Sequence, residues 1–451
     1  MNIGDKQIHA IDNVKKYLNN LKNSDIDLSR SSQCFFFTGG ETPGQARLEF
    51  WRKGWIYLLK FWYTNLKSIL AIASHTKYIE LGNDKVLDNA KILVVSWAFK
   101  NSFQSDGSFY DKYFNENSKD LQNSYWVLIS MDNYVPTNLN NNLKVLKQKK
   151  GFFKYNFVSF FKILISIIFE CKFSIKKIFH YLSFSTYFAK QMSLIIKKEL
   201  KKNNFNMVLM PYEAQPFQHT IFSEAKRYNK KILTVGYIHS MLTPLPCEFI
   251  FRHGAPDLLC VHGVSQIEIL KSRLNWPENR LLLIKSLRFR IENNRSLSGK
   301  IFLPLTIVNK KRLIKAFKNL LINCSPNSFI KLEVMNHPAV LNSEKHISLK
   351  TEIENLMKIY KDKFSNTSLN NKTAIYFGVT TSIFVALEKG IKVIHICADP
   401  VFESLSKEIW PNLEIKKLND FVFQYNLISK RKYIDFGNKN ITLNQTVKTL
   451  Y

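Results

Sequence analysis

The stretch of residues 207–240 constrains the fold more than any other part of this chain. It opens with an apolar run at residues 207–210, which predicts a buried strand, and Pro216 then suits the first turn of a helix. Apolar residues recur at helical spacing as far as Tyr228, and a second apolar run covers residues 232–236. A strand, a helix and a strand of these lengths form a βαβ unit, which requires a parallel sheet.

Polar side chains follow both strands of this unit. Glu213 comes after the first strand, with Tyr212 and Gln215 beside it, and His239 and Ser240 end the second. In open parallel sheets, ligands bind beyond the carboxyl ends of the strands. A carboxylate just before a helix is held ionised by the helix dipole, so Glu213 is a candidate general base, with His239 as its rival. The alternatives are a capping carboxylate and a structural histidine.

Length and cysteine usage bound the class of protein. A chain of 451 residues exceeds what one ordinary core holds, so two or more domains are expected. The six cysteines are widely spaced, without a CxxC pair or a Cys/His cluster, so neither a metal site nor a disulfide framework is indicated. No cofactor is expected either. Residues 1–13 are polar and lack the apolar core of a signal peptide, which favours a cytoplasmic protein with reduced thiols.

The formal charge of +30 resembles a nucleic-acid signal at first sight. Lysine supplies 53 of the 65 basic residues, however, and the lysines are scattered along the chain. Many Asn, Ile and Phe residues accompany them, as expected of an AT-rich genome, so solvated lysines explain much of the excess. We therefore expect no nucleic acid as partner, and rather an anionic membrane surface or a phosphorylated substrate.

One segment could be mistaken for a membrane span. Residues 151–173 are rich in aromatic and aliphatic side chains, but Lys154 and Lys162 interrupt them. The uninterrupted part, residues 163–169, is far shorter than the roughly 20 residues that crossing requires. We expect a buried helix, or a helix on the membrane face whose lysines reach the head groups. The latter predicts a peripheral protein on the inner face of the cytoplasmic membrane.

Apolar strands alternate with amphipathic helices over most of the chain. The expected strands are residues 91–96, 125–130, 207–210, 232–236, 257–261 and 281–284, then 301–307, 329–335, 374–377 and 393–396. The polar stretch 291–300 is the best linker candidate. The pattern predicts an α/β fold of two Rossmann-like domains facing across a cleft. Its predicted parts are an extension packed on the first domain (1–88), a first domain (89–290) with a helical insertion (151–202), and a second domain (296–451).

The second domain offers a candidate anion site. Thr380, Thr381 and Ser382 lie between a strand end and a helix start, where hydroxyls, free N–H groups and the helix dipole favour an anion. His337, followed by Pro338, ends another strand and can donate a hydrogen bond to a phosphate or a ribose. Simple N-capping by the hydroxyls and a structural loop histidine are the alternatives.

Two charged residues complete the candidates. Glu388 lies on the helix that begins at Ser382 and could reach a ribose diol, although an exposed helix glutamate is the alternative. Arg288 ends the first domain in a chain with only 12 arginines. It could bind a phosphate or an anionic acceptor, or it could be a solvated hinge arginine.

The motifs around these residues resemble those of bacterial surface-carbohydrate biosynthesis proteins. Residues 212–217 (YEAQPF) and 236–240 (GYIHS) match a YExQ and GYxHS pattern. Residues 256–263 resemble a PDxxxxxG element, and residues 287–289 (LRF) resemble an LRY element. Residues 336–338 with 380–382 are similar to the HP and Ser/Thr motifs of GT-B transferases of the sialyl and Kdo type, which use CMP-sugars. This chain has Asn336 where Lys or Arg is usual before the HP pair, and threonines where serines are usual. The likeness covers roughly residues 90–400.

This resemblance implies a metal-independent, GT-B-like glycosyltransferase of surface polysaccharide biosynthesis. It would transfer a sugar from a nucleotide-sugar, such as a CMP-sugar, to a glycan or lipid-linked acceptor. Donor contacts are expected from His337, Pro338, Thr380, Thr381, Ser382 and Glu388. Catalysis is expected from Glu213 and His239, and acceptor or phosphate contacts from Tyr212, Gln215, Ser240 and Arg288. A nucleotide-sugar 2-epimerase of the same fold and a non-catalytic assembly protein at the membrane surface remain as alternatives.

Overall fold

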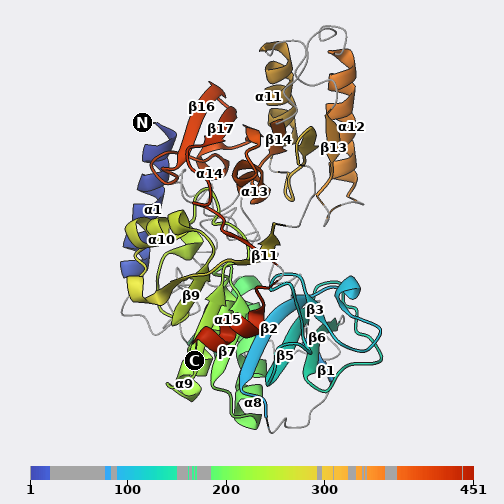
Figure 1. Ribbon diagram of the computed structural model, residues 1–451, viewed down its shortest axis with the longest axis vertical. Helices are drawn as coiled ribbons and strands as arrows, with labels where there is room; N and C mark the ends of the chain where they lie inside the picture. The colour runs from blue at the N-terminus through green and yellow to red at the C-terminus, as the bar shows by residue number, and fades with distance from the viewer. Residues whose placement is uncertain are drawn as a thin grey trace.

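The structure, a computed structural model, describes residues 2–20, 77–82, 89–149, 161, 165–166, 168–169, 184–291, 297–307, 309–323, 332–337, 340, 343–360, 373–438 and 440–450. Two α/β units, each built on its own sheet, lie one above the other in Figure 1. Most strand pairs in both sheets are parallel, and helices connect the strands. The predicted fold class, α/β with two Rossmann-like units, is confirmed.

The first sheet has the strand order β1-β6-β5-β2-β7-β8-β9-β10. Its strands are β1 (Lys77–Gly82), β2 (Ile92–Ala98), β5 (Ser124–Ser130), β6 (Leu143–Lys149), β7 (Met207–Pro211), β8 (Leu233–Tyr237), β9 (Leu258–Val261) and β10 (Leu281–Leu283). Among the described strands of this sheet, β1 and β6 are the one pair that runs antiparallel. Every residue of β2 and β5 is buried, because both faces of a parallel sheet are covered.

The predicted βαβ unit is present. Helix α9 (Pro216–Tyr228) connects β7 to β8, and these strands pair in parallel from Met207 opposite Leu233. Helix α8 (Phe184–Lys202) packs beside α9. The turn before α9 is held by the buried Gln218 side chain, whose Oε1 accepts the backbone N–H groups of Glu213 and Gln215 at 3.0 Å each. The chain therefore enters the helix along one defined path.

The second sheet has the order β13-β12-β14-β15-β17-β16. Its elements are β12 (Lys300–Phe302), α11 (Lys310–Asn323), β13 (Glu333–Met335), α12 (Glu344–Ile359), β14 (Thr373–Phe377), α13 (Ser382–Glu388), β15 (Lys392–Ile396), α14 (Pro400–Glu403), β16 (Leu413–Asn419) and β17 (Val422–Leu427). The predicted strand over residues 301–307 is too long. Strand β12 ends at Phe302, and Pro304 follows two residues later without an N–H group for the ladder.

Shorter elements connect these two sheets and their helices. They are η1 (Lys100–Ser102), β3 (Tyr110–Asp111), β4 (Glu116–Asn117), η2 (Cys247–Phe249), α10 (Val264–Leu274), η3 (Glu278–Arg280), β11 (Ser286–Arg290) and β18 (Phe436–Gly437). One apolar core runs from the first sheet into the second unit, where it includes Phe384 and Trp410. The Trp410 indole N–H donates to the Pro244 carbonyl at 3.1 Å, so the two units share packed and polar contacts.

The first helix lies against the second unit. In helix α1 (Ile3–Asn20), the Gln7 amide donates to the carbonyls of Val401 and Ser404, at 2.9 and 2.8 Å. Figure 1 shows α1, in blue, along the side of the molecule near α14. Residues 1–88 are predicted to pack on the first domain, but residues 21–76 and 83–88 of that extension lie outside the described residues.

The last described segment returns to the first unit. Strand β18 pairs with β11, and helix α15 (Leu443–Leu450), in red in Figure 1, lies by the strands of the first sheet. The Leu443 N–H donates to Glu116 at 2.8 Å. Apolar side chains of α15 fill the core under β2 and β5, which is why this helix packs away from the second sheet, although the sequence groups residues 296–451 together.

Most of the predicted insertion, residues 151–202, precedes α8, and of its residues 151–183 the structure describes only five. Three of these five, Phe161, Ile165 and Phe169, are exposed apolar side chains. Among the helices of the described ranges, none combines the length and apolar character that a membrane span requires.

A tight backbone contact at Gly263 tests the docking of the returning segment. A methyl group at residue 263 would overlap the Tyr433 carbonyl group. The Gly263 φ of −159° is extended backbone that any residue adopts, so this overlap is the main cost of a larger side chain. We expect Gly263→Ala to lower the free energy of unfolding, measured by urea denaturation, by about 1–3 kcal/mol.

The neighbouring Val264→Ala substitution is the matched control. Val264 is 38% exposed, so its truncation should change the free energy of unfolding by about 0.5 kcal/mol or less. Equal stability of the two variants would contradict close docking of the segment at Gly263.

Candidate functional site

Two candidate residues meet at the carboxyl ends of adjacent strands. Glu213 follows β7 and His239 follows β8, and His239 Nε2 lies 3.2 Å from Glu213 Oε1. The other carboxylate oxygen accepts a hydrogen bond from the Gln215 amide at 2.6 Å. The parallel βαβ unit thus brings together three residues that the sequence singles out.

Burial and charge set the protonation of this pair. His239 is 2% exposed, and burial lowers its pKa, a change that the Glu213 charge opposes only in part. Burial alone would raise the pKa of Glu213, but the His239 hydrogen bond and charge, the Gln215 amide and the Arg288 charge together lower it. Near pH 7 we therefore expect an ionised Glu213 beside a neutral His239 that donates through Nε2. The Glu213 side chain remains 38% exposed, so a substrate can reach it.

Arg288 and Tyr113 enclose the pair. Arg288, on β11, donates to the His239 carbonyl over 3.5 Å, and its guanidinium lies 5.8 Å from the centre of the Tyr113 ring. The Tyr113 ring packs edge-on against His239, with 4.5 Å between centroids. His239 Nδ1 is buried without a partner in the described part of the chain. Sequence reasoning missed Tyr113, because its aromatic run looks like ordinary core.

A buried carboxyl holds the turn that carries Tyr113. Asp111 Oδ1 accepts the N–H groups of Tyr113 and Phe114 at 2.7 and 2.9 Å, and the Ser96 hydroxyl hydrogen-bonds Oδ2. Burial raises the pKa of Asp111 to about 6, although these bonds and the Arg288 charge act in the opposite direction. Asp111 positions the aromatic wall of the site and is a second residue that the sequence analysis missed.

The other first-unit candidates, Tyr212 and Ser240, are less available. Tyr212 is buried, and its hydroxyl pairs with His219 Nε2 at 2.9 Å. Ser240 is partly exposed, and its carbonyl lies 3.0 Å from His262 Nε2. Tyr212 therefore contributes packing behind Glu213, whereas Ser240 lies at the surface beside His239.

The second unit contributes the ends of β13 and β14. Thr380, Thr381 and Ser382 are partly exposed, and the Ser382 N–H donates to Thr380 Oγ1 at 3.3 Å. Burial and the charges of His346 and Arg288 lower the pKa of His337. The Arg288 charge thus acts on His337 as well as on Glu213. Pro338 lies outside the described residues.

Two further polar atoms lie near these strand ends. Asn336 Oδ1 and the Tyr376 hydroxyl are buried and lack hydrogen-bond partners within the described residues. Buried polar atoms without partners cost free energy, so each such atom calls for an explanation. Asn336 precedes His337 in the chain, and the Tyr376 ring stacks on Phe302 of the adjacent strand at 4.7 Å.

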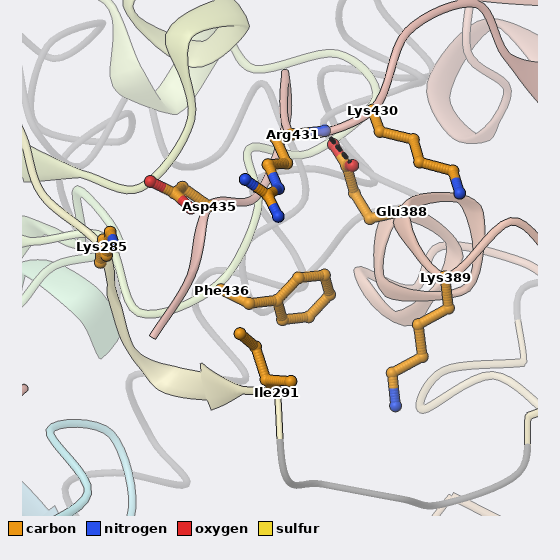
Figure 2. Close-up of a pocket in the computed structure, with 8 residues that line it drawn as sticks. All are labelled: Lys285, Ile291, Glu388, Lys389, Lys430, Arg431, Asp435 and Phe436. Carbon is orange, nitrogen blue, oxygen red and sulfur yellow. Dashed lines mark hydrogen bonds between the residues drawn. The ribbon is translucent and has the colours of Figure 1, made fainter. Parts of the chain in front are cut away.

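Glu388 is buried rather than exposed on its helix. Its carboxylate accepts the backbone N–H groups of Arg431, Tyr433 and Ile434, at 2.5, 2.8 and 3.2 Å. Figure 2 shows the Arg431 bond at the wall of a cavity of about 350 Å³, beside Phe436 and Ile291. These three bonds occupy most of the acceptor capacity of the carboxylate. The alternative of an exposed helix glutamate is therefore wrong.

Metal ligands are not gathered in this region. Over the described ranges, no group of three or more His, Cys, Asp or Glu side chains is arranged to hold a metal ion. Positive charge is supplied here by the Arg288 guanidinium, which acts on Glu213, His239 and His337.

Comparison with known proteins finds structural similarity but no sequence match. No protein-family model matches the chain, and no curated protein matches it. Among solved structures, the chain is similar to that of alpha,alpha-trehalose 6-phosphate synthase from Burkholderia multivorans. The identity is 9%, the alignment covers 64% of this chain and 76% of that chain, and the TM-score is 0.34.

The raised pKa of Asp111 predicts a pH-dependent stability. The pKa of the Asp111 carboxyl is about 6 in the folded chain and 3.8 ordinarily, so the folded chain favours the protonated form. Its contribution to the free energy of unfolding is therefore full below pH 3.8 and is lost as pH rises through 6. Asparagine can keep the Tyr113 and Phe114 bonds and donate to Ser96. Asp111→Asn should therefore be more stable than the parent at pH 8, by up to about 3 kcal/mol, and similar to it at pH 4.

Urea denaturation at both pH values measures this difference. Asp106→Asn is the control on the same loop, because hydrogen bonds from Lys119 and Ser108 lower the pKa of Asp106. That control should lose stability at pH 8 instead. Equal free energies of unfolding for the parent chain and Asp111→Asn at both pH values would show that ionisation of Asp111 does not destabilise the fold.

Proposed function

We propose that this chain is a glycosyltransferase that moves a sugar from a nucleotide-sugar to a hydroxyl group of a glycan or lipid-linked acceptor. The observation that carries the proposal is the pairing of an ionised, partly exposed Glu213 with a buried, neutral His239. This pair lies at the carboxyl edge of the first sheet and shares the field of Arg288 with His337 of the second unit. The motif resemblance of residues 212–240 and 336–382 adds the substrate class.

In the proposed reaction, the acceptor hydroxyl attacks the anomeric carbon of the donor while the bond from that carbon to the nucleotide phosphate breaks. Glu213 takes the hydroxyl proton. A carboxylate with a lowered pKa is a weak base toward a free hydroxyl, so proton transfer accompanies bond breaking, when the attacking oxygen becomes more acidic. The His239 N–H orients the carboxylate, and the Arg288 guanidinium stabilises the charge that develops on the leaving phosphate.

The donor is assigned to the second unit. His337 can donate a hydrogen bond as a neutral imidazole, and the hydroxyls of Thr380, Thr381 and Ser382 are partly exposed beside it in the fold. Asn336 and Tyr376 supply polar atoms that a nucleotide can pair. The HP-type motif favours a CMP-sugar. The Glu388 carboxylate has little hydrogen-bond acceptor capacity left, so we propose that it only borders the donor side.

The acceptor side is assigned to the first unit, where Gln215 and Ser240 flank the Glu213–His239 pair. Surface polysaccharides are assembled on lipid carriers, and the exposed apolar residues Phe161, Ile165 and Phe169 recur at helical spacing in a lysine-rich chain. These features support peripheral attachment to the inner face of the cytoplasmic membrane.

Glu213→Gln tests the catalytic assignment. The substitution keeps the size and the Gln215 contact but removes the proton acceptor, so sugar transfer should fall by about 10²-fold or more. Nucleotide affinity, measured by titration calorimetry, should stay within about twofold, because the donor contacts are on the other unit. Glu333→Gln is the matched control, since the Glu333 side chain is 65% exposed on β13. Full activity of Glu213→Gln would refute the role of the carboxylate.

His337→Ala tests the donor site. Loss of one hydrogen bond to a phosphate or ribose should weaken the binding of CMP by about tenfold, as measured by calorimetry. Titrations with UDP and GDP run alongside. A preference for UDP would refute the CMP-sugar and favour an epimerase of the same fold, and no nucleotide binding at millimolar concentration would favour an assembly protein without catalysis.

A further inference from the structure

A second cavity lies behind the βαβ unit and shares no lining residue with the Glu213–His239 pair. Its volume is about 670 Å³, and it lies between α1, the second half of α9 and the loop of residues 251–257. Leu18, Phe222 and Phe251 supply apolar walls. A cavity of this size falls within the range of small-molecule sites.

The charge of this cavity is strongly positive. Five of its lining residues are permanent cations and one is a carboxylate; the cations are Lys226, Arg227, Lys230, Arg252 and Arg280. The carboxylate of Asp257 pairs with Lys226 at 2.5 Å. Over the described ranges, neither Lys230 nor Arg280 pairs with a carboxylate. The cavity therefore attracts an anion.

Two buried polar groups of the lining are unsatisfied. Arg252 is 7% exposed; its Nη atoms donate to three backbone carbonyls, but its Nε has no partner within the described residues. The Ser223 hydroxyl is buried and lacks a partner in the same part of the chain. Both residues line the cavity. An oxyanion accepts hydrogen bonds from N–H and O–H donors of this kind, with charge assistance from arginine.

The backbone brings the loop that carries Arg252 close to Ser223. Gly254 has a φ of +81°, and a side chain there would contact the His219 carbonyl at 2.8 Å and Ser223 Oγ at 2.9 Å. Only glycine lets the loop of Arg252 approach α9 so closely. The unpaired groups of Arg252 and Ser223 therefore lie on a loop and a helix that the fold holds in close contact.

We propose that this cavity binds a phosphate monoester that carries an apolar or ring-bearing body. The phosphate hydrogen-bonds Arg252 Nε and Ser223 Oγ, Lys230 and Arg280 neutralise its second charge at the rim, and the body packs on Phe222 and Phe251. The ligand is a soluble phosphate ester or the head group of a lipid phosphate, since both present this chemistry.

Arg252 also connects this cavity to the candidate catalytic loop. Its Nη2 donates to the Ala214 carbonyl at 3.2 Å. Ala214 has a φ of +55°, in the left-handed region that alanine rarely adopts, and it directly follows Glu213. A ligand that fixes Arg252 therefore stabilises the strained peptide beside Glu213. Occupancy of the cavity and order in the catalytic loop are thus coupled.

Calorimetry with phenyl phosphate on the full chain tests the site. We expect one site per chain, weaker binding of inorganic phosphate, and no binding of benzyl alcohol. Ser223→Ala should weaken phenyl phosphate binding by about tenfold without lowering the melting temperature, because the hydroxyl has no partner to lose. The double variant Lys230→Ala/Arg280→Ala should weaken it further. Unchanged binding in both variants would overturn the proposal.

Two controls separate this site from others. His337→Ala should leave phenyl phosphate binding unchanged, which distinguishes the cavity from the proposed donor site. Lys318→Ala, on α11, removes one lysine elsewhere and should also have no effect. Cosedimentation with phosphatidylcholine vesicles that contain phosphatidic acid assigns the source: loss of cosedimentation in Ser223→Ala supports a lipid phosphate, and phenyl phosphate binding without cosedimentation supports a soluble ester.

Hydrogen exchange measures the coupling without any assay of sugar transfer. Phenyl phosphate should slow amide exchange in the peptide of residues 207–218 in the parent chain, and not in Ser223→Ala at the same concentration. Unchanged exchange in the saturated parent chain would overturn the coupling. Failure of the glycosyltransferase assignment would leave both measurements intact.

Discussion

One buried carboxylate holds the two units in their relation to each other. Glu388, at the end of α13 in the second unit, accepts three backbone N–H groups of residues 431–434, where the chain starts its return toward the first sheet. Backbone amides lack side-chain rotamers, so these bonds fix the returning segment at little cost in conformational entropy. Because that segment leads into β18, which pairs with β11, it also helps to fix the strand that carries Arg288. The candidate site thus depends on a contact outside it.

Within the site, burial and exposure are divided between two partners. His239 is enclosed by aromatic rings and held neutral, whereas the partly exposed Glu213 keeps its charge through His239, Gln215 and Arg288. Burial by itself moves both pKa values toward the uncharged form, so burial accounts for the neutral His239, whereas Glu213 needs its three partners to stay ionised. Asp111 supports the arrangement from below by fixing the turn that carries Tyr113. Burial raises the pKa of Asp111 to about 6, so we expect this support to weaken as Asp111 ionises.

The sequence predicts the features that depend on residues close to one another in the chain. The βαβ unit, the buried strands and the meeting of Glu213 with His239 follow from local periodicity and from parallel strand order. The predicted strand over residues 301–307 is too long because Pro304 ends the ladder. The β16–β17 hairpin is not evident from the sequence because the charged residues of β16 conceal the alternation. Long-range pairings escape such reasoning. Glu388 finds its amides 43 to 46 residues later.

The return of α15 to the first sheet has a consequence for biosynthesis. Leu443 and Val447 complete the core that contains Trp126, and 327 residues separate Leu443 from its partner Glu116. At the usual rates of translation, roughly 16 to 65 seconds therefore separate the synthesis of Glu116 from that of Leu443. During that interval the apolar face that α15 covers is open to solvent. The first unit therefore completes its core only after the second unit has been synthesised.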